Sequence, residues 1–324
     1  MRILIEGENL ENYLAKCHEA FRTGLRAFYD TRCFGKGYLR YSPFVKTFGQ
    51  IQKKMFPDRD PDLLIAETWF PRNLEWGFKY HGIENIRTTK VVTLRDFWSE
   101  AEKQLDRYID FIEMNQIHFI LSLFPQPLTL WKDTPLGNRL LYIPPTFDPK
   151  LFNDWQMPKT YDVGFLAAGT VEKVDFYPER YNIHQKILQR KDLFYLWAKH
   201  PGWKMYKNEH ALVGKNFSKL INSCKIFITT GGIYRNPQPK IFESLASRTL
   251  LMSDEPVGVE LIGLEDGVNY VKITEDSVMD KIDYYLSRPE ERESIAENGF
   301  QLAMRRHSCY ARALDFYKAI QPRL

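Results

Sequence analysis

Short apolar segments alternate with amphipathic segments along most of the chain. The apolar segments have the length of buried strands, and the amphipathic segments repeat apolar residues at helical spacing. Strands are expected in the first half at RILIEG (2–7), PDLLIAET (61–68), KVVTL (90–94), IHFILSLF (117–124) and LLYIP (140–144). Long helices are expected over residues 12–29 and 96–114. Because strands alternate with helices, the pattern predicts a mostly parallel sheet built from β-α-β units.

The same pattern begins again in the second half. Strands are expected at YDVGFLA (161–167), LFYLWA (193–198), KIFITT (225–230) and TLLM (249–252). Helices are expected over residues 179–191, after His210, after Pro239, over residues 276–287 and from Pro289 to His307. A proline-rich stretch at residues 144–160 separates the two halves. The sequence therefore predicts two α/β units in tandem, joined in this stretch.

The segment PKIFESLASRTLLMSDEP (239–256) combines a short helix with a buried strand. Proline suits a first helical turn, so the helix should begin just after Pro239. Phe242 and Leu245 fall on its apolar face, and Lys240 and Glu243 fall on the opposite face. Two interpretations of Glu243 stay open here. It is either an ordinary solvated carboxylate or a hydrogen-bond acceptor held at the mouth of a ligand cleft.

Ligands bind at the carboxyl ends of strands in parallel sheets, which directs attention to the loops that follow them. The loop ITTGGIYRNPQPK (228–240) leads directly into the short helix. Gly231 and Gly232 permit unusual backbone conformations, and loop N–H groups at a helix start favour anions. Lys240 adds a positive charge there, which a bound phosphate would balance. The alternative is that Lys240 simply extends into water.

Composition adds few constraints. The chain has 324 residues, of which 44% are hydrophobic and 27% charged, as in ordinary soluble globular proteins. Forty-five basic residues against 41 acidic ones give a formal charge of +4. This excess is too small to indicate a nucleic-acid-binding face, which usually shows clustered basic residues.

Targeting and metal signals are lacking in the sequence. The start, MRILIEGEN, is expected to be a strand and a turn, not a signal peptide, and the longest apolar runs are too short to span a bilayer. The four cysteines have no C-x-x-C spacing, which favours reduced thiols and a cytoplasmic protein. The seven histidines show no metal-ligand spacing, so we expect no metal.

Three stretches of the chain resemble GT-B-fold glycosyltransferases of the group 1 and CgeB-like branch. IPPTFDPKLF (143–152) resembles the interdomain sequence of that family. KIFESLASRTLLMSDEP (240–256) resembles its R/K-x-F-E-x-L-A-x-G-x-L-L-x-x-D pattern, although Arg248 stands in the glycine place. The segment from Tyr284 to Tyr317 resembles its C-terminal run, with a Pro-Glu-Glu-Arg element before G…RH and a closing helix.

The resemblance implies a particular architecture. Two Rossmann-like domains would hold a nucleotide sugar in the cleft between them. We expect an acceptor-side domain over residues 1–150 and a nucleotide-sugar-binding domain over residues 151–308. Residues 309–324 would form a closing helix that packs back on the first domain.

The resemblance also implies donor-binding residues. Glu243 matches the glutamate that accepts hydrogen bonds from the ribose hydroxyls, and an ionised carboxylate suits a vicinal diol. By position, the candidates for contacts with the diphosphate are Gly169, Lys173, Arg180 and Lys240, together with Gly231 and Gly232. Arg180 could instead only anchor its helix. Arg235 stands where many relatives carry a second glutamate, near the transferred sugar.

In the first domain, Gly7 and Glu8 follow the first strand, where relatives present a loop to the diphosphate or the acceptor. Asp96 matches the aspartate of a His-Asp pair in relatives, and Arg95 replaces the histidine. A catalytic role and an ordinary N-cap role both stay open for Asp96. Glu67 and His81 are weaker candidates.

The resulting expectation is transfer of a sugar from a nucleoside-diphosphate sugar to an acceptor hydroxyl. Neither a metal nor a cofactor is expected, and the anomeric configuration is expected to be retained. The acceptor would be a carbohydrate, a glycoconjugate or another hydroxyl compound. Two alternatives stay open: a glycosyltransferase that modifies hydroxylated bases in DNA, and a non-catalytic module that binds nucleotide sugars.

Overall fold

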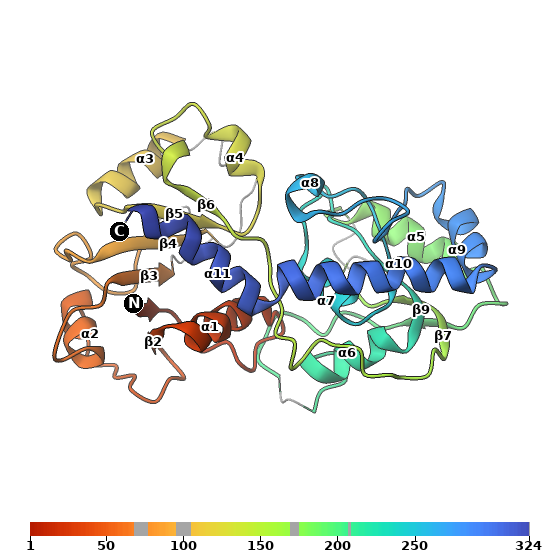
Figure 1. The fold of residues 1–324 in the computed structure, drawn as a ribbon, viewed down its shortest axis with the longest axis horizontal. Coiled ribbons are helices and arrows are strands. Elements are labelled where there is room, and N and C mark those ends of the chain that lie inside the picture. The colour runs from red at the N-terminus through yellow and green to blue at the C-terminus, as the bar shows by residue number, and fades with distance from the viewer. Residues whose placement is uncertain (68–76, 95–104, 169–174, 207–208, 324) are drawn as a thin grey trace. The chain divides into compact units, whose positions relative to one another are not determined.

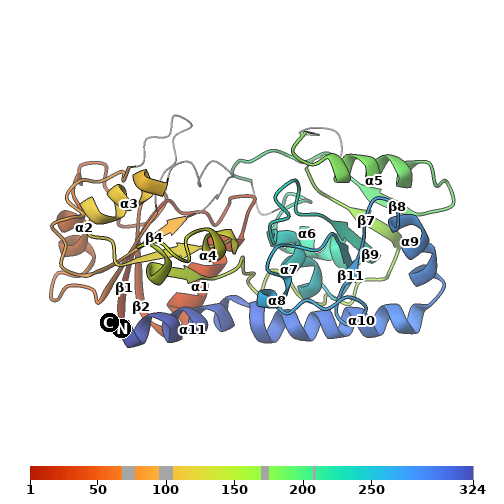
Figure 2. The ribbon, with the colours of Figure 1, turned by 90° about the horizontal axis from the view of Figure 1, so that it is seen from above.

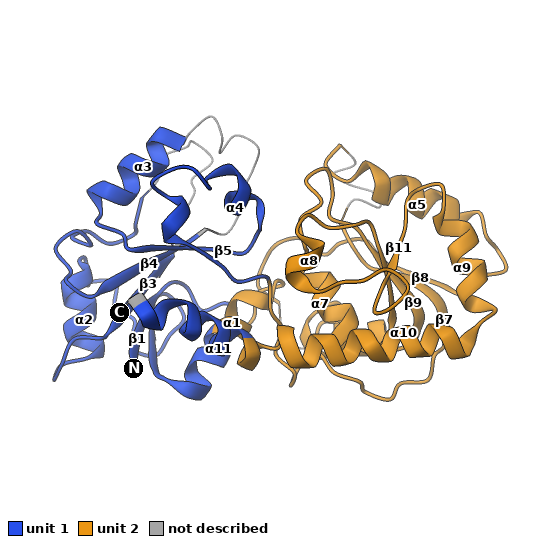
Figure 3. Cartoon of the chain, turned by 45° about the horizontal axis from the view of Figure 1, so that its top comes forward, with its two compact units in different colours: residues 1–10, 22–144, 312–324 blue, residues 11–21, 145–311 orange. Residues whose placement is uncertain are grey.

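The computed structural model describes residues 1–67, 77–94, 105–168, 175–206 and 209–323. These residues form two compact units (Figures 1 and 3). Unit 1 consists of residues 1–10, 22–144 and 312–324, and unit 2 consists of residues 11–21 and 145–311. Residues 11–21, expected in the first domain, thus belong to unit 2, and residues 312–324 of the closing helix belong to unit 1.

Unit 1 is built on a six-stranded sheet in the order β2-β1-β3-β4-β5-β6, and every pairing in it is parallel. Glu6 at the end of β1 lies opposite Phe34 of β2 and Ala66 of β3. The strands are β1 (Arg2–Glu6), β2 (Asp30–Phe34), β3 (Leu63–Glu67), β4 (Thr89–Leu94), β5 (Phe119–Ser122) and β6 (Leu140–Tyr142).

Helices cover both faces of this sheet. The core on one face contains Leu4, Leu64 and Val92 from the strands, together with side chains of α2 and α3. Figure 2 shows α1 and α11 on the opposite side of the sheet, and the Tyr29 and Tyr317 rings lie 5.3 Å apart there. The helices are α1 (Cys17–Phe28), α2 (Phe48–Met55), α3 (Leu105–Met114), α4 (Gln126–Leu130) and α11 (Cys309–Ile320), with 3-10 turns at Gly137–Arg139 and Gln321–Arg323.

Unit 2 contains a second all-parallel sheet, in the order β11-β10-β9-β7-β8. From β7 the chain adds β8 on one side and then β9 on the other, so the strand order reverses between β7 and β9. Such a switch point is where open α/β sheets bind ligands. The strands are β7 (Tyr161–Phe165), β8 (Tyr195–Trp197), β9 (Cys224–Thr229), β10 (Leu250–Ser253) and β11 (Val271–Lys272).

The helices of unit 2 also form two layers. The core between the sheet and α5, α9 and α10 includes Ile226, Ile183 and Ile282, and α6 and α7 contact β9 from the other layer. The helices are α5 (Pro178–Leu188), α6 (Gly214–Asn222), α7 (Pro239–Ala246), α8 (Val259–Ile262), α9 (Val278–Leu286) and α10 (Pro289–Leu302), followed by a π-helical turn at Ala303–His307.

The expected α/β class with parallel sheets is confirmed, and every expected strand is present. The sequence missed β2 (Asp30–Phe34), an edge strand that carries two charged residues, and α2, which begins at a Thr47 capping box. All four cysteines lie among the described residues as buried thiols. In the described part of the chain, the helices are too short or too polar to cross a bilayer.

The close approach of β7 to β9 gives a first prediction. A Cβ atom added at Gly164 would lie 2.5 Å from Cys224 Sγ and 3.0 Å from the Phe227 ring. Overpacking of this kind costs about 1–3 kcal/mol, so Gly164→Ala should lower the free energy of unfolding by that amount. Denaturant unfolding would measure it. Gly49→Ala is the control, because its Cβ would meet nothing within 4 Å. An equal loss in both variants would contradict this account of the packing.

Candidate functional site

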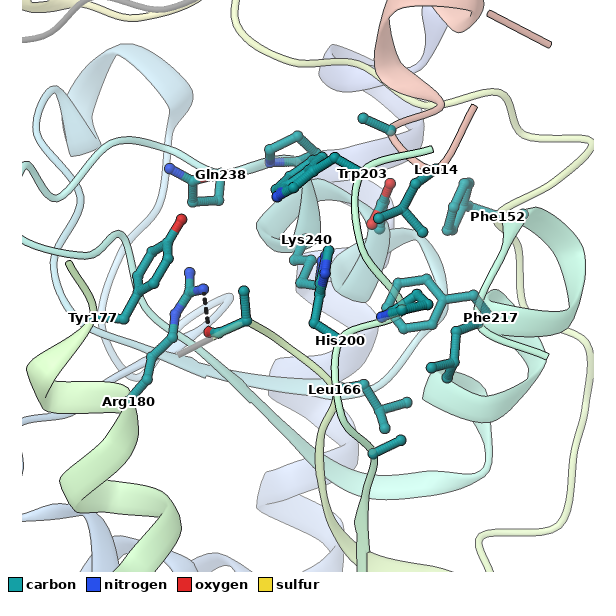
Figure 4. A pocket seen from close by; sticks show the side chains of 18 residues that line it. Leu14, Phe152, Leu166, Tyr177, Arg180, His200, Trp203, Phe217, Gln238 and Lys240 are labelled. Atoms are coloured by element: carbon teal, nitrogen blue, oxygen red, sulfur yellow. Dashed lines mark hydrogen bonds between the residues drawn. The ribbon is translucent and has the colours of Figure 1, made fainter. Parts of the chain in front are cut away.

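A pocket lies at the switch point of the unit 2 sheet (Figure 4). Leu166 and Ala168 reach it from the end of β7, and His200 from the end of β8. Lys240 and Glu243 reach it from α7, which follows the β9 loop. The pocket therefore occupies the carboxyl edge of the sheet, where the sequence predicts a ligand site.

The pocket opens to solvent. Its volume, counted with the open space in front of it, is about 790 Å³. This value lies within the range of about 300–1,000 Å³ that is common for ligand pockets, so the site has room for a nucleotide-sized ligand. The other residues that line it are Leu14, Ala15, Phe152, Tyr177, Arg180, Ala198, Pro201, Trp203, Leu212, Gly214, Phe217, Gln238 and Pro239.

Arg180 of α5 links the ends of two strands beneath the pocket. It is only 4% exposed, and Nη1 donates to the Ala168 carbonyl oxygen at 2.9 Å (Figure 4). Nε donates to Thr230 Oγ1 at 3.2 Å, and Nη2 donates to the Thr230 carbonyl oxygen. Burial lowers the pKa of Arg180 to about 10, so the group stays charged at neutral pH. Arg180 therefore both anchors its helix and lines the pocket, and the two roles considered for it do not exclude each other.

Glu243 is a buried carboxylate. Its exposure is 6%, which excludes a solvated side chain. Burial raises its pKa to about 7, and the nearby Lys240 partly offsets this rise. The Phe242 ring fixes the direction of α7, because it packs against the buried His307 ring at 4.7 Å. The sequence placed Glu243 correctly in the helix.

Lys240 does not simply extend into water, as the alternative interpretation had it. It is half-buried in the pocket wall, and its Nζ lies 5.5 Å from the centre of the Phe217 ring. Burial lowers its pKa, whereas the charge of Glu243 raises it. A cation and a carboxylate thus sit one helical turn apart in the same pocket.

The glycine loop differs from the expected anion site in one respect. The Gly231 N–H donates to the Asp254 carboxylate at 2.9 and 3.1 Å, so it is not available to a phosphate. Asp254 is 2% exposed, also accepts a hydrogen bond from Ser253, and follows β10. The Gly231 amide therefore holds the loop to the end of the next strand, and a contact of Gly231 with the donor stays a prediction.

Gly232 and Arg235 shape the same loop. Gly232 has φ +72, and a Cβ atom there would lie 2.8 Å from the Tyr177 ring. Tyr177 in turn stacks on the Arg180 guanidinium at 3.9 Å. Arg235 is exposed, has φ +46 and does not line the pocket. Gly232 thus allows the loop to approach an aromatic wall of the pocket.

The sequence missed that aromatic wall. Tyr177, His200, Trp203 and Phe217 come from three separate segments, and only the fold brings these segments together (Figure 4). The His200 and Trp203 rings lie 5.0 Å apart, and Trp203 is 51% exposed. The high aromatic share of the chain, 15%, is the only sequence signal for this wall.

A second polar cluster occupies the carboxyl edge of the unit 1 sheet. Arg22 is 2% exposed, forms an ion pair with Glu67, and donates to the Glu8 carbonyl oxygen at 2.5 Å and to Tyr38 Oη at 2.7 Å. A Cβ atom at Gly7 would lie 2.2 Å from a Glu67 carboxylate oxygen. Gly7 and Glu8 are therefore held by Arg22, which the sequence analysis did not single out, and by Glu67, which it named only as a weaker candidate.

Glu6 completes this cluster at the end of β1. It is 3% exposed, and its pKa rises to about 8 because of burial and, secondarily, the Glu67 charge. The Lys79 and Arg22 charges oppose this rise. Glu6 is therefore mostly protonated at neutral pH, a property that the sequence analysis did not predict.

Several expected residues lie outside the described part of the chain: Arg95, Asp96, Gly169 and Lys173. Their roles stay predictions. His81 is exposed, and its backbone pairs with Lys46 and Phe48 in the loop before α2. Groups of three or more histidine, cysteine or acidic side chains that could hold a metal ion are absent from the described residues.

Comparison with known proteins agrees with this architecture. Residues 180–318 match a family model described as glycosyl transferase-like. HepE of Anabaena, solved in complex with UDP, is 12% identical with a TM-score of 0.66, over 99% of this chain and 100% of that chain. A sucrose-phosphate synthase of Thermosynechococcus elongatus is 10% identical with a TM-score of 0.60, over 99% and 98% of the two chains.

A glycosyltransferase of Rickettsia africae is also similar, at 10% identity and a TM-score of 0.62, over 99% of this chain and 98% of that chain. A search of curated proteins found no match. The expected GT-B fold with two Rossmann-like units is confirmed, and the match to the glycosyl transferase-like model falls mainly on unit 2. The assignment to the CgeB-like branch stays a prediction.

The buried bonds of Arg180 give a second prediction. Arg180→Met should lower the free energy of unfolding by at least about 1.5–3 kcal/mol, because hydrogen bonds from a charged donor have that value and two carbonyl oxygens lose their partner. Arg190→Met is the control. Arg190 pairs with Asp192 and Asp283 at the surface, where ion pairs contribute about 0–1 kcal/mol. Similar losses in thermal unfolding of both variants would count against the link between the strand ends.

Proposed function

We propose that this protein transfers a sugar from a nucleoside-diphosphate sugar to an acceptor hydroxyl, and that unit 2 binds the donor. One observation carries the proposal. Glu243 and Lys240 face one pocket at the switch point of a sheet, within the segment that matches the glycosyl transferase-like model. A buried carboxylate beside a cation suits a ligand that combines a diol with phosphate.

Glu243 would bind the ribose. An ionised carboxylate has two acceptor oxygens and can accept from both hydroxyls of a vicinal diol. Its burial excludes competing water, so the diol would replace the lost solvent contacts. Because only the ionised form accepts from both hydroxyls, the raised pKa of Glu243 should make ribose binding depend on pH.

Lys240 and Arg180 would act on the diphosphate. Negative charge develops on the leaving nucleoside diphosphate as the glycosidic bond breaks, and fixed cations in a partly enclosed pocket stabilise it. Arg180 is held by backbone carbonyl oxygens and so needs no rearrangement during the reaction. Protein cations would perform the task that a divalent metal has in other transferases, and this supports a metal-independent reaction. Retention of the anomeric configuration is part of the same proposal.

The uridine nucleotides are the first donors to test. HepE, which shares the fold, was solved with UDP and with UDP-glucose. In the pocket, the His200 and Trp203 rings offer apolar faces on which a base can stack. Asp96 remains a candidate for catalysis or acceptor binding, and Gly7 and Glu8 remain candidates for contacts with the diphosphate or the acceptor.

Donor turnover tests this function directly. The protein would be incubated with UDP-glucose in the presence of EDTA, and release of UDP would be followed with and without a panel of hydroxyl acceptors. Acceptor-dependent release supports the transferase. Binding of UDP-glucose without release, in every acceptor tested, would indicate a nucleotide-sugar-binding module instead.

Glu243→Gln gives a third prediction. The amide keeps the shape but removes one acceptor, so affinity for UDP-glucose should fall by about 1–3 kcal/mol, the range for hydrogen bonds to charged groups. The 2′-deoxyribose analogue should bind the unaltered protein poorly and respond little to the substitution. Isothermal titration calorimetry would measure both ligands. Glu260→Gln, an exposed position outside the pocket, is the control.

The same variant should lose a dependence on pH. Because the Glu243 pKa is about 7 in the free protein and the ionised form binds the diol, affinity for UDP-glucose should rise with pH through that value. The diphosphate of a nucleotide sugar is doubly esterified and does not titrate there. A pH dependence that persists in Glu243→Gln, or equal losses for the ribose and deoxyribose ligands, would show that Glu243 does not bind the ribose.

Lys240→Ala gives a fourth prediction. Affinity for UDP should fall by about 1.5–3 kcal/mol, the value of a charged hydrogen bond, whereas affinity for uridine should change little. Lys191→Ala is the control, because Lys191 is exposed on the same unit and does not line the pocket. Equal losses for UDP and uridine would mean that Lys240 does not contact phosphate.

A further inference from the structure

One surface of unit 1 is basic and has no acidic residue in its sequence segment. Between Asp30 and Asp58 the chain carries six lysine and arginine residues and no aspartate or glutamate. Five of these six are exposed: Lys36, Arg40, Lys46, Lys53 and Lys54. They lie in the loop that joins β2 to α2 and in α2 itself (Figure 1). We call residues 36–46 together with Lys53 and Lys54 the basic loop surface.

The same loop presents two large apolar side chains to solvent. Leu39 is 102% exposed and Phe44 is 86% exposed, the two highest values among the large hydrophobic residues of the described chain. Exposure of single apolar residues is common, but Leu39 and Phe44 lie close together in one basic loop, and neither contributes to the core.

The loop is ordered around these two residues. Tyr41 and Val45 pack against the core of unit 1, and turn hydrogen bonds join Tyr41 to Tyr38 and Val45 to Ser42. The loop therefore alternates between side chains that anchor it and side chains that point outward. The exposure of Leu39 and Phe44 is therefore a feature of a loop with defined hydrogen bonds and core contacts.

The cations of this surface are not neutralised by the protein. None of the five exposed basic residues forms an ion pair with another described residue, and the ammonium group of Lys46 donates to the Pro43 carbonyl oxygen, which carries no full charge. Elsewhere in unit 1, Arg2, Arg59 and Arg139 are paired with carboxylates. The positive charge of the basic loop surface is thus available to an external anionic partner.

We propose that the basic loop surface docks on an anionic lipid bilayer. Leu39 and Phe44 would enter the boundary between headgroups and acyl chains, and the surrounding lysines and arginines would contact lipid phosphates. Exposed apolar side chains in the same loop as exposed cations combine the two contributions that hold a protein on a membrane, apolar burial and attraction to anionic lipids. This surface lies outside the donor pocket, and the inference does not rest on the proposed transfer reaction.

A bilayer fits these side chains better than a nucleic acid does. Leucine has no aromatic face on which a base can stack, and a fully exposed leucine gains little from a phosphate backbone. Nucleic-acid binding would depend on the cations and hardly on Leu39. The response of binding to the removal of Leu39 and Phe44 therefore separates a bilayer from duplex DNA, whose bases are stacked on each other and do not reach Phe44.

Vesicle flotation tests the proposal. The full chain should bind vesicles that contain phosphatidylglycerol and should not bind vesicles of phosphatidylcholine alone. The double variant Leu39→Ala/Phe44→Ala should bind at least about tenfold more weakly, because apolar burial is lost while all charges remain. Lys53→Gln/Lys54→Gln should weaken binding at low salt and reduce its dependence on salt. Met114→Ala is the control, because Met114 is 71% exposed elsewhere on unit 1.

The outcomes are distinguishable. Unchanged thermal unfolding of the double variant is expected, since neither side chain is buried, and the comparison is made only at equal foldedness by circular dichroism. Equal binding to both kinds of vesicle, or equal binding of the double variant and the unaltered chain, would overturn the proposal. Salt-sensitive binding to duplex DNA that the double variant retains in full, without vesicle binding, would also overturn it.

Discussion

The buried guanidinium of Arg180 is the interaction on which the pocket of unit 2 depends. It sits where the strand order reverses, and it bonds to the backbone at the ends of both β7 and β9. Both strand ends carry carbonyl oxygens that have left the sheet ladder, and buried carbonyl oxygens without partners are costly. The Arg180 guanidinium donates to both carbonyl oxygens and thereby fixes the spacing between the two strand ends. Arg180 and Ala168 also line the pocket at this point.

The direction of α7 depends on a different set of contacts. Phe242 packs against His307, and a Cβ atom at Gly299 of α10 would lie 2.7 Å from Leu245 and 2.6 Å from the Asn269 carbonyl oxygen. Gly299 and His307 belong to the G…RH pattern of the C-terminal segment, and this segment therefore packs against α7. These contacts hold Phe242 and Leu245 on the buried side of α7, and Glu243 is therefore directed into the pocket.

Both units bury a glutamate at the carboxyl edge of their sheet. The pKa values of Glu6 and Glu243 rise to about 8 and about 7 because burial disfavours the ionised form. Between the ordinary glutamate pKa of 4.5 and these values, the folded chain holds protons that the unfolded chain has released. These two groups therefore make the free energy of unfolding fall as pH rises through that interval. Carboxylates with raised pKa values are found more often at functional sites than elsewhere, although structural networks also perturb pKa values.

The sequence predicted the strands well and the site in part, for identifiable reasons. Buried parallel strands are apolar runs that need no context, whereas the charged edge strand β2 gives no such signal. Glu243 and Lys240 were found because they belong to one short motif on one helix. The aromatic wall around His200, and the pairing of Arg22 with Glu67, were missed because their members meet only through long-range packing.

The departure from the family pattern at Arg248 shows how a local change can leave the site intact. Arg248 stands in the place of a glycine, directly after α7, and has φ +48. The backbone thus keeps the left-handed conformation that glycine adopts freely, at a cost of about 1–2 kcal/mol for a residue with a side chain. The guanidinium bonds to Asp154 at 2.9 Å and to Glu297 at 2.6 Å, and each half-exposed pair returns about 0–1 kcal/mol. These terms nearly offset the cost, so the turn keeps its shape. Because the turn fixes where α7 ends and β10 begins, the arginine leaves the helix that carries Glu243 in the same place as a glycine would.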